Sequence, residues 1–329
     1  MNCIQELKFK IEDNFLFFLR NSEIHEIFKY RPELYNLIES SIFFSNENKT
    51  AAVLMILTYI GYNKTDDLDS ELIFHISSIL ELITLLSVIE SESNSITEKQ
   101  NGAPHIRPFS KQELITATGM ISSVILNELI KLKIEKKYTH QITSIFAEAK
   151  LKFYTAKLKQ SLLKNKIPGI TLNNLFEIYD MKSMQIFQLP MQLPAIISNT
   201  ISDFDFLKES ALYFGRAFQI VKEINSFSPE KVLNYNIISA LLWKQAQPNE
   251  KKELRKLFAS IKDIKNSDEV NSIILKIKEY DILEKAAEHA QDLKETGISA
   301  LIKTKLKDNV QDDIANFMDS LIVVKQPQM

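Results

Sequence analysis

The chain has 329 residues and a mass of 37.9 kDa, with 40 lysines and arginines against 42 aspartates and glutamates. Its single cysteine, Cys3, excludes an internal disulfide framework, and the balanced charge argues against a polybasic nucleic-acid-binding surface. Hydrophobic residues make up 45% of the chain, which is enough for a large buried core and argues against disorder. The first residues show no basic and apolar leader pattern, so we expect a reducing cytoplasmic location.

Glycine is scarce in this sequence, with six residues in 329, against an average of about 7% in proteins. Sheets with many strands need glycine at their turns, so the scarcity predicts an all-α fold. The sequence shows no repeat of fixed period and no long linker of low complexity. We therefore expect one all-α domain, a helical bundle, over residues 1–329.

Apolar residues recur at helical spacing in three segments, with lysine and glutamate between them. A capping-box pattern at Ser110 and Glu113 precedes the first segment, and Ser228-Pro229-Glu230 predicts another helix start. Pro190 and Pro194 should kink or end a helix near Leu189. The three stripes are Ile121, Val124, Ile125, Leu129 and Leu132; Leu254, Leu257, Phe258, Ile261 and Ile264; and Val270, Ile273, Ile274 and Ile277.

The stretch from Leu72 to Ile89 is apolar over about the length of a membrane span. His75 and Glu81 interrupt it, and several serine and threonine residues dilute it. We interpret the stretch as a helix buried on all sides in a bundle and expect no membrane span.

Short motifs occur in a recognisable order along the chain and resemble landmarks of the trans-polyprenyl diphosphate synthases. Asn48 to Leu54 resembles the Lys-Arg-x-Arg-Pro-x-Leu stretch of that family, and His75 to Glu81 resembles its His-x-x-Ser-Leu-x-His run. Gly102-Ala103-Pro104 is similar to the Gly-x-Pro that follows, and Gly119-Met120 stands where a Gly-Asp precedes a long helix. Lys182-Ser183 resembles the Lys-Thr pair, and Gly215 to Val221 resembles the Gly-x-x-Phe-Gln run. The resemblance spans Lys49 to Ala240 and implies the all-α isoprenoid synthase fold.

Both aspartate-rich motifs of that family lack their acids in this chain. The first would occupy Leu82 to Leu86, where Leu82, Ile83 and Leu86 stand in a run without any carboxylate. The second would occupy Lys222 to Ser226, where Glu223 survives beside Lys222. Of the basic stretch only Lys49 is left, and the arginine pair after the first motif has no counterpart in residues 98–101.

The missing acids bear on the chemistry that the resemblance implies. In the family, Mg²⁺ ions held between two carboxylate clusters stabilise the diphosphate that leaves an allylic substrate. Mg²⁺ requires oxygen ligands, which leucine and isoleucine do not supply, and Lys222 brings positive charge to the metal position. We therefore expect no intact catalytic residue, no metal and no cofactor, with Mg²⁺ needed only if the protein is active after all.

Other acidic and metal-ligating residues form no site that we can recognise. The acidic runs at Asp66-Asp67-Leu68-Asp69, Asp203-Phe204-Asp205 and Asp312-Asp313 are expected to be solvated residues near helix ends. Histidines lack paired ligand spacing, which argues against zinc, and Cys3 lacks the surroundings of a nucleophile. The histidines are His25, His75, His105, His140 and His289.

Several retained residues remain candidates for ligand binding. If affinity for a diphosphate persists, we expect its cations to be Lys49, Lys182 and Lys222. The candidate pocket residues, for which core or surface packing is an equally good explanation, are His75, Ser77, Ser78, Phe218 and Gln219.

A class I terpene cyclase is a less favoured interpretation. Ser226 and Glu230 have the spacing of the serine and glutamate in the metal-binding triad of those enzymes. Lys222 replaces the first ligand, however, and Pro229 breaks the helical face that the triad requires.

Three functions stay open at this point. The first is a catalytically silent partner or regulatory subunit that forms a homodimer, or a heterodimer with a motif-complete prenyl synthase. The second is an active isoprenyl transferase with rearranged ligands, drawn from Glu223, Glu230 or Asp66 to Asp69. The third is a binder of prenyl lipids, or an interaction module unrelated to prenyl metabolism.

Overall fold

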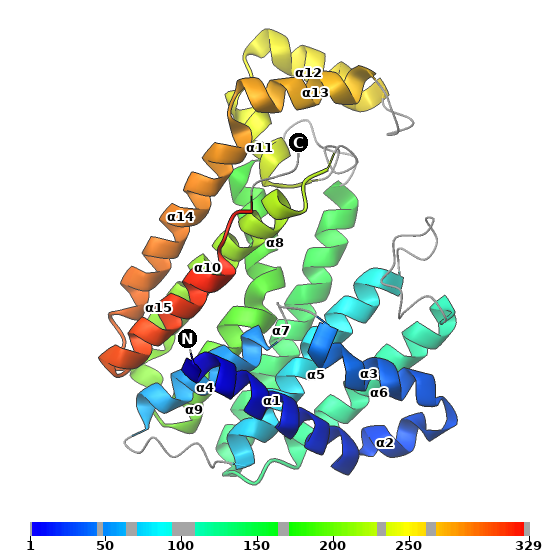
Figure 1. Ribbon diagram of the computed structural model, residues 1–329, viewed down its shortest axis with the longest axis vertical. Helices are drawn as coiled ribbons and strands as arrows, with labels where there is room; N and C mark the ends of the chain where they lie inside the picture. The colour runs from blue at the N-terminus through cyan, green and yellow to red at the C-terminus, as the bar shows by residue number, and fades with distance from the viewer. Residues whose placement is uncertain are drawn as a thin grey trace. The chain divides into compact units, whose positions relative to one another are not determined.

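The computed structural model describes residues 2–44, 49–63, 71–93, 109–163, 171–228, 235–260 and 268–325 (Figure 1). All regular elements in these ranges are helical, which confirms the predicted all-α fold. The N-terminal elements are α1 (Asn2–Asn21), α2 (Glu23–Ile27), η1 (Phe28–Tyr30), α3 (Pro32–Phe44), α4 (Thr50–Tyr62), α5 (Glu71–Ser93), α6 (Lys111–Ile130) and α7 (Lys136–Leu163). They are followed by α8 (Leu172–Ser183), η2 (Met184–Gln188), α9 (Leu189–Ile197), η3 (Ile201–Asp203), α10 (Phe204–Asn225), α11 (Ile237–Gln245), α12 (Pro248–Ser260), α13 (Asp268–Glu279), α14 (Ile282–Leu301) and α15 (Asp308–Leu321).

The chain divides into two compact units. Unit 1 consists of Met1–Glu148, Gln185–Asp205 and Lys305–Ile314, and unit 2 consists of Ala149–Met184, Phe206–Thr304 and Ala315–Met329. The boundaries fall inside the helices α7, α10 and α15, not in linkers. A single domain over residues 1–329 stays a prediction.

Helix α5 forms the centre of unit 1, where it packs against α1, α3, α4 and α6. Most of its residues from Ile73 to Leu86 are buried, and Ile76, Ile79 and Leu82 are fully buried. This is the buried helix that the stretch from Leu72 to Ile89 predicted.

Two described helices are long and apolar enough to cross a membrane, judged by length and composition alone. They are Glu71–Glu90, of which 72% is buried, and Lys111–Ile130, of which 39% is buried. The burial of the first fits a core helix, and the absence of a membrane span stays a prediction.

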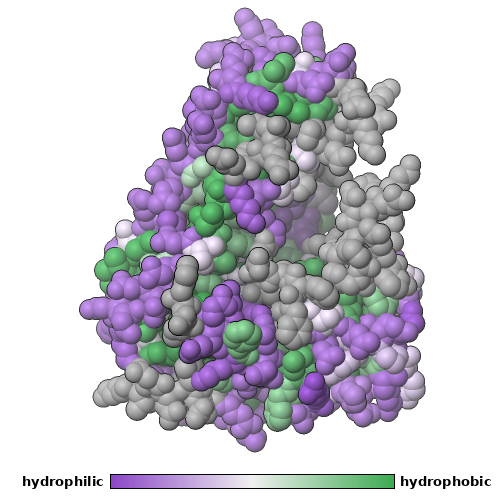
Figure 2. Space-filling model, in the orientation of Figure 1, coloured by the Kyte–Doolittle hydropathy of each residue, from purple (hydrophilic) through white to green (hydrophobic). Residues whose placement is uncertain are grey.

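In unit 2, α10 turns an apolar face toward the interior and packs closely on α14. A Cβ atom at Gly297 of α14 would lie 2.8 Å from the ring of Phe214 on α10, so this crossing requires a glycine. Helix α11 packs against α8 and α14, and α12 pairs with α13. The surface over α12 and α13 is mostly hydrophilic (Figure 2).

Short-range sequence patterns correctly predicted the start of α6 and its buried face. The N–H of Glu113 donates to the Ser110 hydroxyl, and the N–H of Ser110 donates to the Glu113 carboxylate, so the capping box at the start of α6 is confirmed. The stripe from Ile121 to Leu129 is buried in α6, and Leu132 is buried just after the helix ends.

The stripes of α12 and α13 are confirmed only in part. In α12, Leu254 is buried and Leu257 is partly exposed, while Ile261 and Ile264 lie outside the described residues. In α13, Val270, Ile273 and Ile277 are buried, whereas Ile274 is partly exposed.

The prolines were predicted to kink or end a helix near Leu189; the helical segment does not end there, but the type of helix changes at Leu189. Pro190 is the second residue of α9, where an amide without hydrogen leaves no intrahelical bond unmade, and Pro194 lies inside the same helix. A π-helical turn, η2, precedes α9 and joins it to α8. The chain therefore remains helical around Leu189, because the wider turn absorbs the irregularity that the prolines introduce.

Gly119 lies inside α6 and does not precede a long helix, which corrects that part of the motif interpretation. The helix start expected at Ser228 extends beyond the described residues, since Pro229 and Glu230 are outside them. The next described helix, α11, is capped by Asn236, whose side-chain oxygen accepts from the N–H of Ser239 at 2.9 Å.

Candidate functional site

The predicted position of the first aspartate-rich motif lies in the middle of α5, inside the core of unit 1. Leu82, Ile83 and Leu86 are all buried, and Leu82 is completely inaccessible. The hydroxyl of Thr84 donates to the carbonyl oxygen of Leu80 at 3.1 Å, so it serves the helix itself. This segment contributes packing to the core of unit 1 and supplies no carboxylate.

The nearest carboxylate in the sequence belongs to Glu81, which is buried with 4% of its surface exposed. It accepts hydrogen bonds from the backbone N–H groups of Lys49 at 3.1 Å and Ala52 at 3.3 Å, at the beginning of α4. Burial raises the pKa of Glu81 to about 7, while the two N–H donors act in the opposite direction. Glu81 therefore holds the N-terminus of α4 against α5.

Lys49 is one of the three predicted diphosphate-binding cations, and it lies in unit 1. Its backbone adopts a left-handed conformation with φ of 73°, and its ammonium group forms an ion pair with Glu12 of α1. Burial lowers the pKa of the neighbouring Lys8, and the Lys49 charge lowers it further. Lys49 thus belongs to a small charged cluster that connects α1 to the start of α4.

The other two predicted cations, Lys182 and Lys222, lie together in unit 2. Burial lowers the pKa of Lys182, the Glu223 charge opposes this shift, and the charges of Lys157 and Lys222 lower it further. The ammonium group of Lys222 also lies 6.0 Å from the ring centre of Phe218, and that of Lys157 lies 4.7 Å from the ring centre of Phe153. The charges of Lys157 on α7 and of Lys222 and Glu223 on α10 therefore all act on Lys182 of α8.

Glu223 is the acid that survives at the predicted second motif. Its Oε2 atom accepts from the phenol of Tyr179 and from the N–H of Ile237 at 2.8 Å, where α11 begins. Tyr179 is buried, and burial together with the Glu223 charge raises its pKa. Glu223 thus caps α11 in unit 2, as Glu81 caps α4 in unit 1, whereas Ser226 is exposed at the turn after α10.

Sequence reasoning missed three members of this cluster: Lys157, Tyr179 and Ile237. Lys157 lies in a lysine-rich helix with no motif around it, and Ile237 contributes only its backbone. The position of Tyr179, one turn before Lys182 on α8, is the one signal that could have indicated it.

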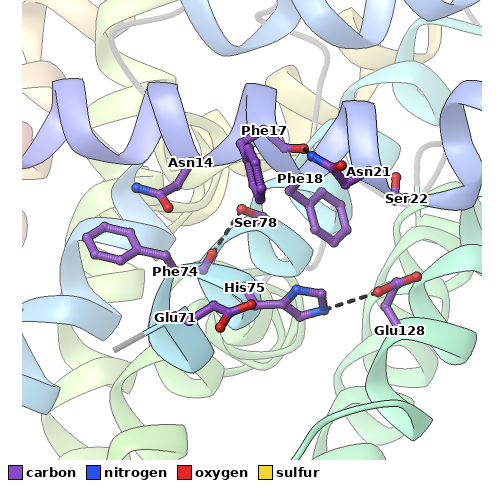
Figure 3. Close-up of a pocket in the computed structure, with 10 residues that line it drawn as sticks. All are labelled: Asn14, Phe17, Phe18, Asn21, Ser22, Glu71, Phe74, His75, Ser78 and Glu128. Atoms are coloured by element: carbon purple, nitrogen blue, oxygen red, sulfur yellow. Dashed lines mark hydrogen bonds and ion pairs between the residues drawn. The ribbon is translucent and has the colours of Figure 1, made fainter. Parts of the chain in front are cut away.

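The predicted pocket residues separate into two groups. His75 and Ser78 line a cavity of about 240 Å³ within unit 1, formed by α1, α5 and α6 (Figure 3). Ser77 is buried elsewhere, with its hydroxyl 3.9 Å from the Met55 sulfur. Phe218, which is buried, and Gln219, which is partly exposed, belong to unit 2.

His75 is held in place by two neighbours. Its Nε2 atom lies 3.1 Å from a carboxylate oxygen of Glu128 on α6. The Phe18 ring approaches the imidazole edge-on, with 5.1 Å between the ring centres. The imidazole thus links α5 to both α1 and α6.

One of the acidic runs departs from the prediction. Asp203 is buried, not solvated, and accepts from the phenol of Tyr62 at 3.1 Å and from the N–H of Lys305. It fastens η3 to two other segments of unit 1. Asp205 is exposed in the first turn of α10, as expected, while Asp66 to Asp69 lie outside the described residues.

Within the described ranges, no group of three or more histidine, cysteine, aspartate or glutamate side chains lies where it could hold a metal ion. The expectation that no metal is bound stays a prediction.

No protein-family model and no curated protein matches this sequence. Solved structures, by contrast, resemble the whole chain. The geranylgeranyl pyrophosphate synthetase from Pyrococcus horikoshii is 18% identical with a TM-score of 0.76, covering 98% of this chain and 99% of that one. The corresponding enzyme from the archaeon Geoglobus acetivorans is 14% identical with a TM-score of 0.79, covering 97% and 99%. The heptaprenyl diphosphate synthase from Staphylococcus aureus is 15% identical with a TM-score of 0.72, covering 97% and 96%.

These likenesses establish the fold: the chain has the all-α fold of the polyprenyl diphosphate synthases, as the motif resemblance implied. With identities this low they establish the fold alone. The assignment of Leu82 to Leu86 and Lys222 to Ser226 as former metal motifs stays a prediction from the sequence.

Proposed function

We propose that this protein is a catalytically silent member of the prenyl synthase fold that acts as a partner subunit of an active isoprenyl transferase. The observation that carries the proposal is that the two acidic residues at or beside the predicted motif positions both stabilise the start of a helix. Glu81 and Glu223 stand at or beside the predicted motif positions, and each accepts backbone N–H groups at the start of a helix. Both carboxylates are thus committed to the fold of their own unit.

This donor set does not fit Mg²⁺. The ion requires oxygen ligands in near-octahedral geometry, usually from one or two carboxylates at each site. Oxygens of Glu81 and Glu223 already accept hydrogen bonds from backbone N–H groups, which leaves these carboxylates less capacity to bind a metal ion. Lys182 and Lys222 beside Glu223 would also repel a divalent cation. These features support the absence of metal-assisted prenyl transfer.

An exposed apolar face of α6 supports the partner role. Ile115, Leu126 and Ile130 point to the same side of the helix and are each at least half exposed. Gly119 shares this side, and a Cβ atom there would meet nothing within 4 Å, so the packing of this chain does not require the glycine. A face with exposed large apolar side chains around a glycine allows another helix to approach closely.

The test is to mix the purified protein with a motif-complete prenyl synthase and to measure co-elution, reaction rate and product length. We expect a stable complex and a change in rate or product length. Leu126→Lys should abolish both, whereas Leu275→Lys, which alters a leucine on α13 that is 65% exposed against 50% for Leu126, should leave them unchanged. A protein that elutes alone and leaves such synthases unaffected contradicts the proposal.

The lysine cluster favours a second candidate function, the binding of a prenyl diphosphate without metal. Burial is the main cause that lowers the pKa of Lys182, and the charges of Lys157 and Lys222 lower it further, so an added anion would stabilise the charged form of Lys182. Farnesyl diphosphate should then bind in the presence of a chelator, and Lys157→Gln should weaken the binding. Binding that needs Mg²⁺, or no binding at all, excludes this function.

A further inference from the structure

We propose that the cavity beside His75 is a binding site for a small organic cation, an ammonium group on a short apolar stem. The cavity lies within unit 1 and is bordered by α1, α5 and α6 (Figure 3). Neither Glu81 nor Glu223 lines this cavity, and ligand binding here does not depend on the partner role proposed above.

Three phenylalanines are among the residues that line the cavity. Phe17 and Phe18 extend from α1, and Phe74 lies on α5 with its ring directed away from that of Phe18 (Figure 3). Phe18 and Phe74 are buried, and Phe17 is exposed at the rim. Phenyl faces attract a cation within about 6 Å of the ring centre, and the attraction is stronger where water is excluded.

Carboxylates supply the charge of the cavity. Glu128 is buried with 7% exposure and contacts His75, while the carboxylate of Glu71 lies beside the same imidazole (Figure 3). None of the ten residues that line the cavity is lysine or arginine. The nearby ammonium of Lys131 lies 3.6 Å from Glu128 but also 2.9 Å from Glu23, so it is shared between two acids. Negative charge is therefore in excess around the cavity.

The same lining is unsuited to the ligands that the fold suggests. A prenyl chain would desolvate Glu71, Glu128 and the amides of Asn14 and Asn21 without giving them hydrogen bonds. A diphosphate would face two carboxylates without a basic partner in the lining. An ammonium group satisfies the carboxylates, and an apolar stem fits against the rings.

The size of the cavity limits the ligand. A volume of about 240 Å³ lies below the range of roughly 300–1,000 Å³ that is typical of drug-sized ligands. Phenethylamine is a suitable probe because it combines one ammonium group, one ring and a two-carbon stem. Its neutral analogue 2-phenylethanol has nearly the same shape and lacks the charge.

The experiment measures binding of both probes to the full-length protein by calorimetry and ligand-observed NMR. Phenethylamine should bind at least about tenfold more tightly than 2-phenylethanol, as expected for one charge-assisted hydrogen bond. Glu128→Gln should weaken phenethylamine binding by a similar factor. Glu71→Gln, at an exposed position in the first turn of α5, should weaken it too. Glu135→Gln, which removes an exposed acid of unit 1 away from the cavity, should have no effect.

Several outcomes would overturn the proposal. They are the absence of phenethylamine binding, equal affinity for the neutral analogue, and affinity that survives both Glu71→Gln and Glu128→Gln. The first would leave the cavity as a solvent-filled gap, and the other two would show that its charge plays no part.

Discussion

Replacing Glu223 with glutamine isolates its proposed role as the cap of α11. In the wild-type protein the carboxylate accepts from the Tyr179 phenol and from the N–H of Ile237. Hydrogen bonds to a charged acceptor contribute about 1.5–3 kcal/mol each, and those to a neutral amide oxygen contribute about 0.5–1.5 kcal/mol. Glu223→Gln therefore lowers the free energy of unfolding by about 2 kcal/mol, because two charged bonds become neutral ones.

For a chain of 329 residues this loss corresponds to a decrease in Tm of roughly 3 °C, measured by differential scanning calorimetry. Glu209→Gln, an exposed position on the same helix, is the matched control and should change stability by less than about 0.5 kcal/mol. Millimolar Mg²⁺ should leave the Tm of the wild type and of both variants unchanged. If Mg²⁺ stabilises the wild type and Glu223→Gln removes that effect, Glu223 is a metal ligand and the capping argument is wrong.

Further predictions concern Glu81 and two glycines. The pKa of Glu81 is raised from 4.5 to about 7 in the folded protein, so the folded state holds more protons in that range and loses stability as pH rises through it. The loss is on the order of 3 kcal/mol, and denaturant titrations at pH 5 and pH 8 should show it in the wild type but not in Glu81→Gln. Gly297→Ala forces its methyl group against the Phe214 ring and should lower stability by about 1–3 kcal/mol. Gly119→Ala, in open space on α6, should instead raise it by up to about 1 kcal/mol in thermal unfolding, and equal effects of the two alanines would refute the packing at Gly297.

The fold follows from the sequence wherever local rules decide the structure. Scarce glycine, apolar residues at helical spacing and the Ser110–Glu113 capping box each depend on neighbours within a few residues, and the structure agrees with them. The region of Pro190 and Pro194 does not follow, because the π turn that accommodates it depends on the packing around α9.

The candidate site is only partly visible in the sequence. Lys182 and Lys222 could be selected from the motif resemblance, but Lys157 could not, because its proximity to them arises from the packing of α7 in unit 2. The roles of Glu81 and Asp203 were hidden for a similar reason. Glu81 accepts from backbone N–H groups 29 and 32 residues away, and Asp203 accepts from a backbone N–H group 102 residues away and from the phenol of Tyr62, 141 residues away, so neighbouring residues give no sign of these contacts.

The most direct test of catalytic silence is a turnover assay of the purified protein alone, with isopentenyl diphosphate, radiolabelled farnesyl diphosphate and millimolar Mg²⁺. We predict no chain elongation above a control without protein. Elongation that increases with protein concentration and disappears with a chelator would contradict the account. It would require a working metal site, whereas Glu81 and Glu223, the acids at or beside the predicted motifs, stabilise helix N-termini.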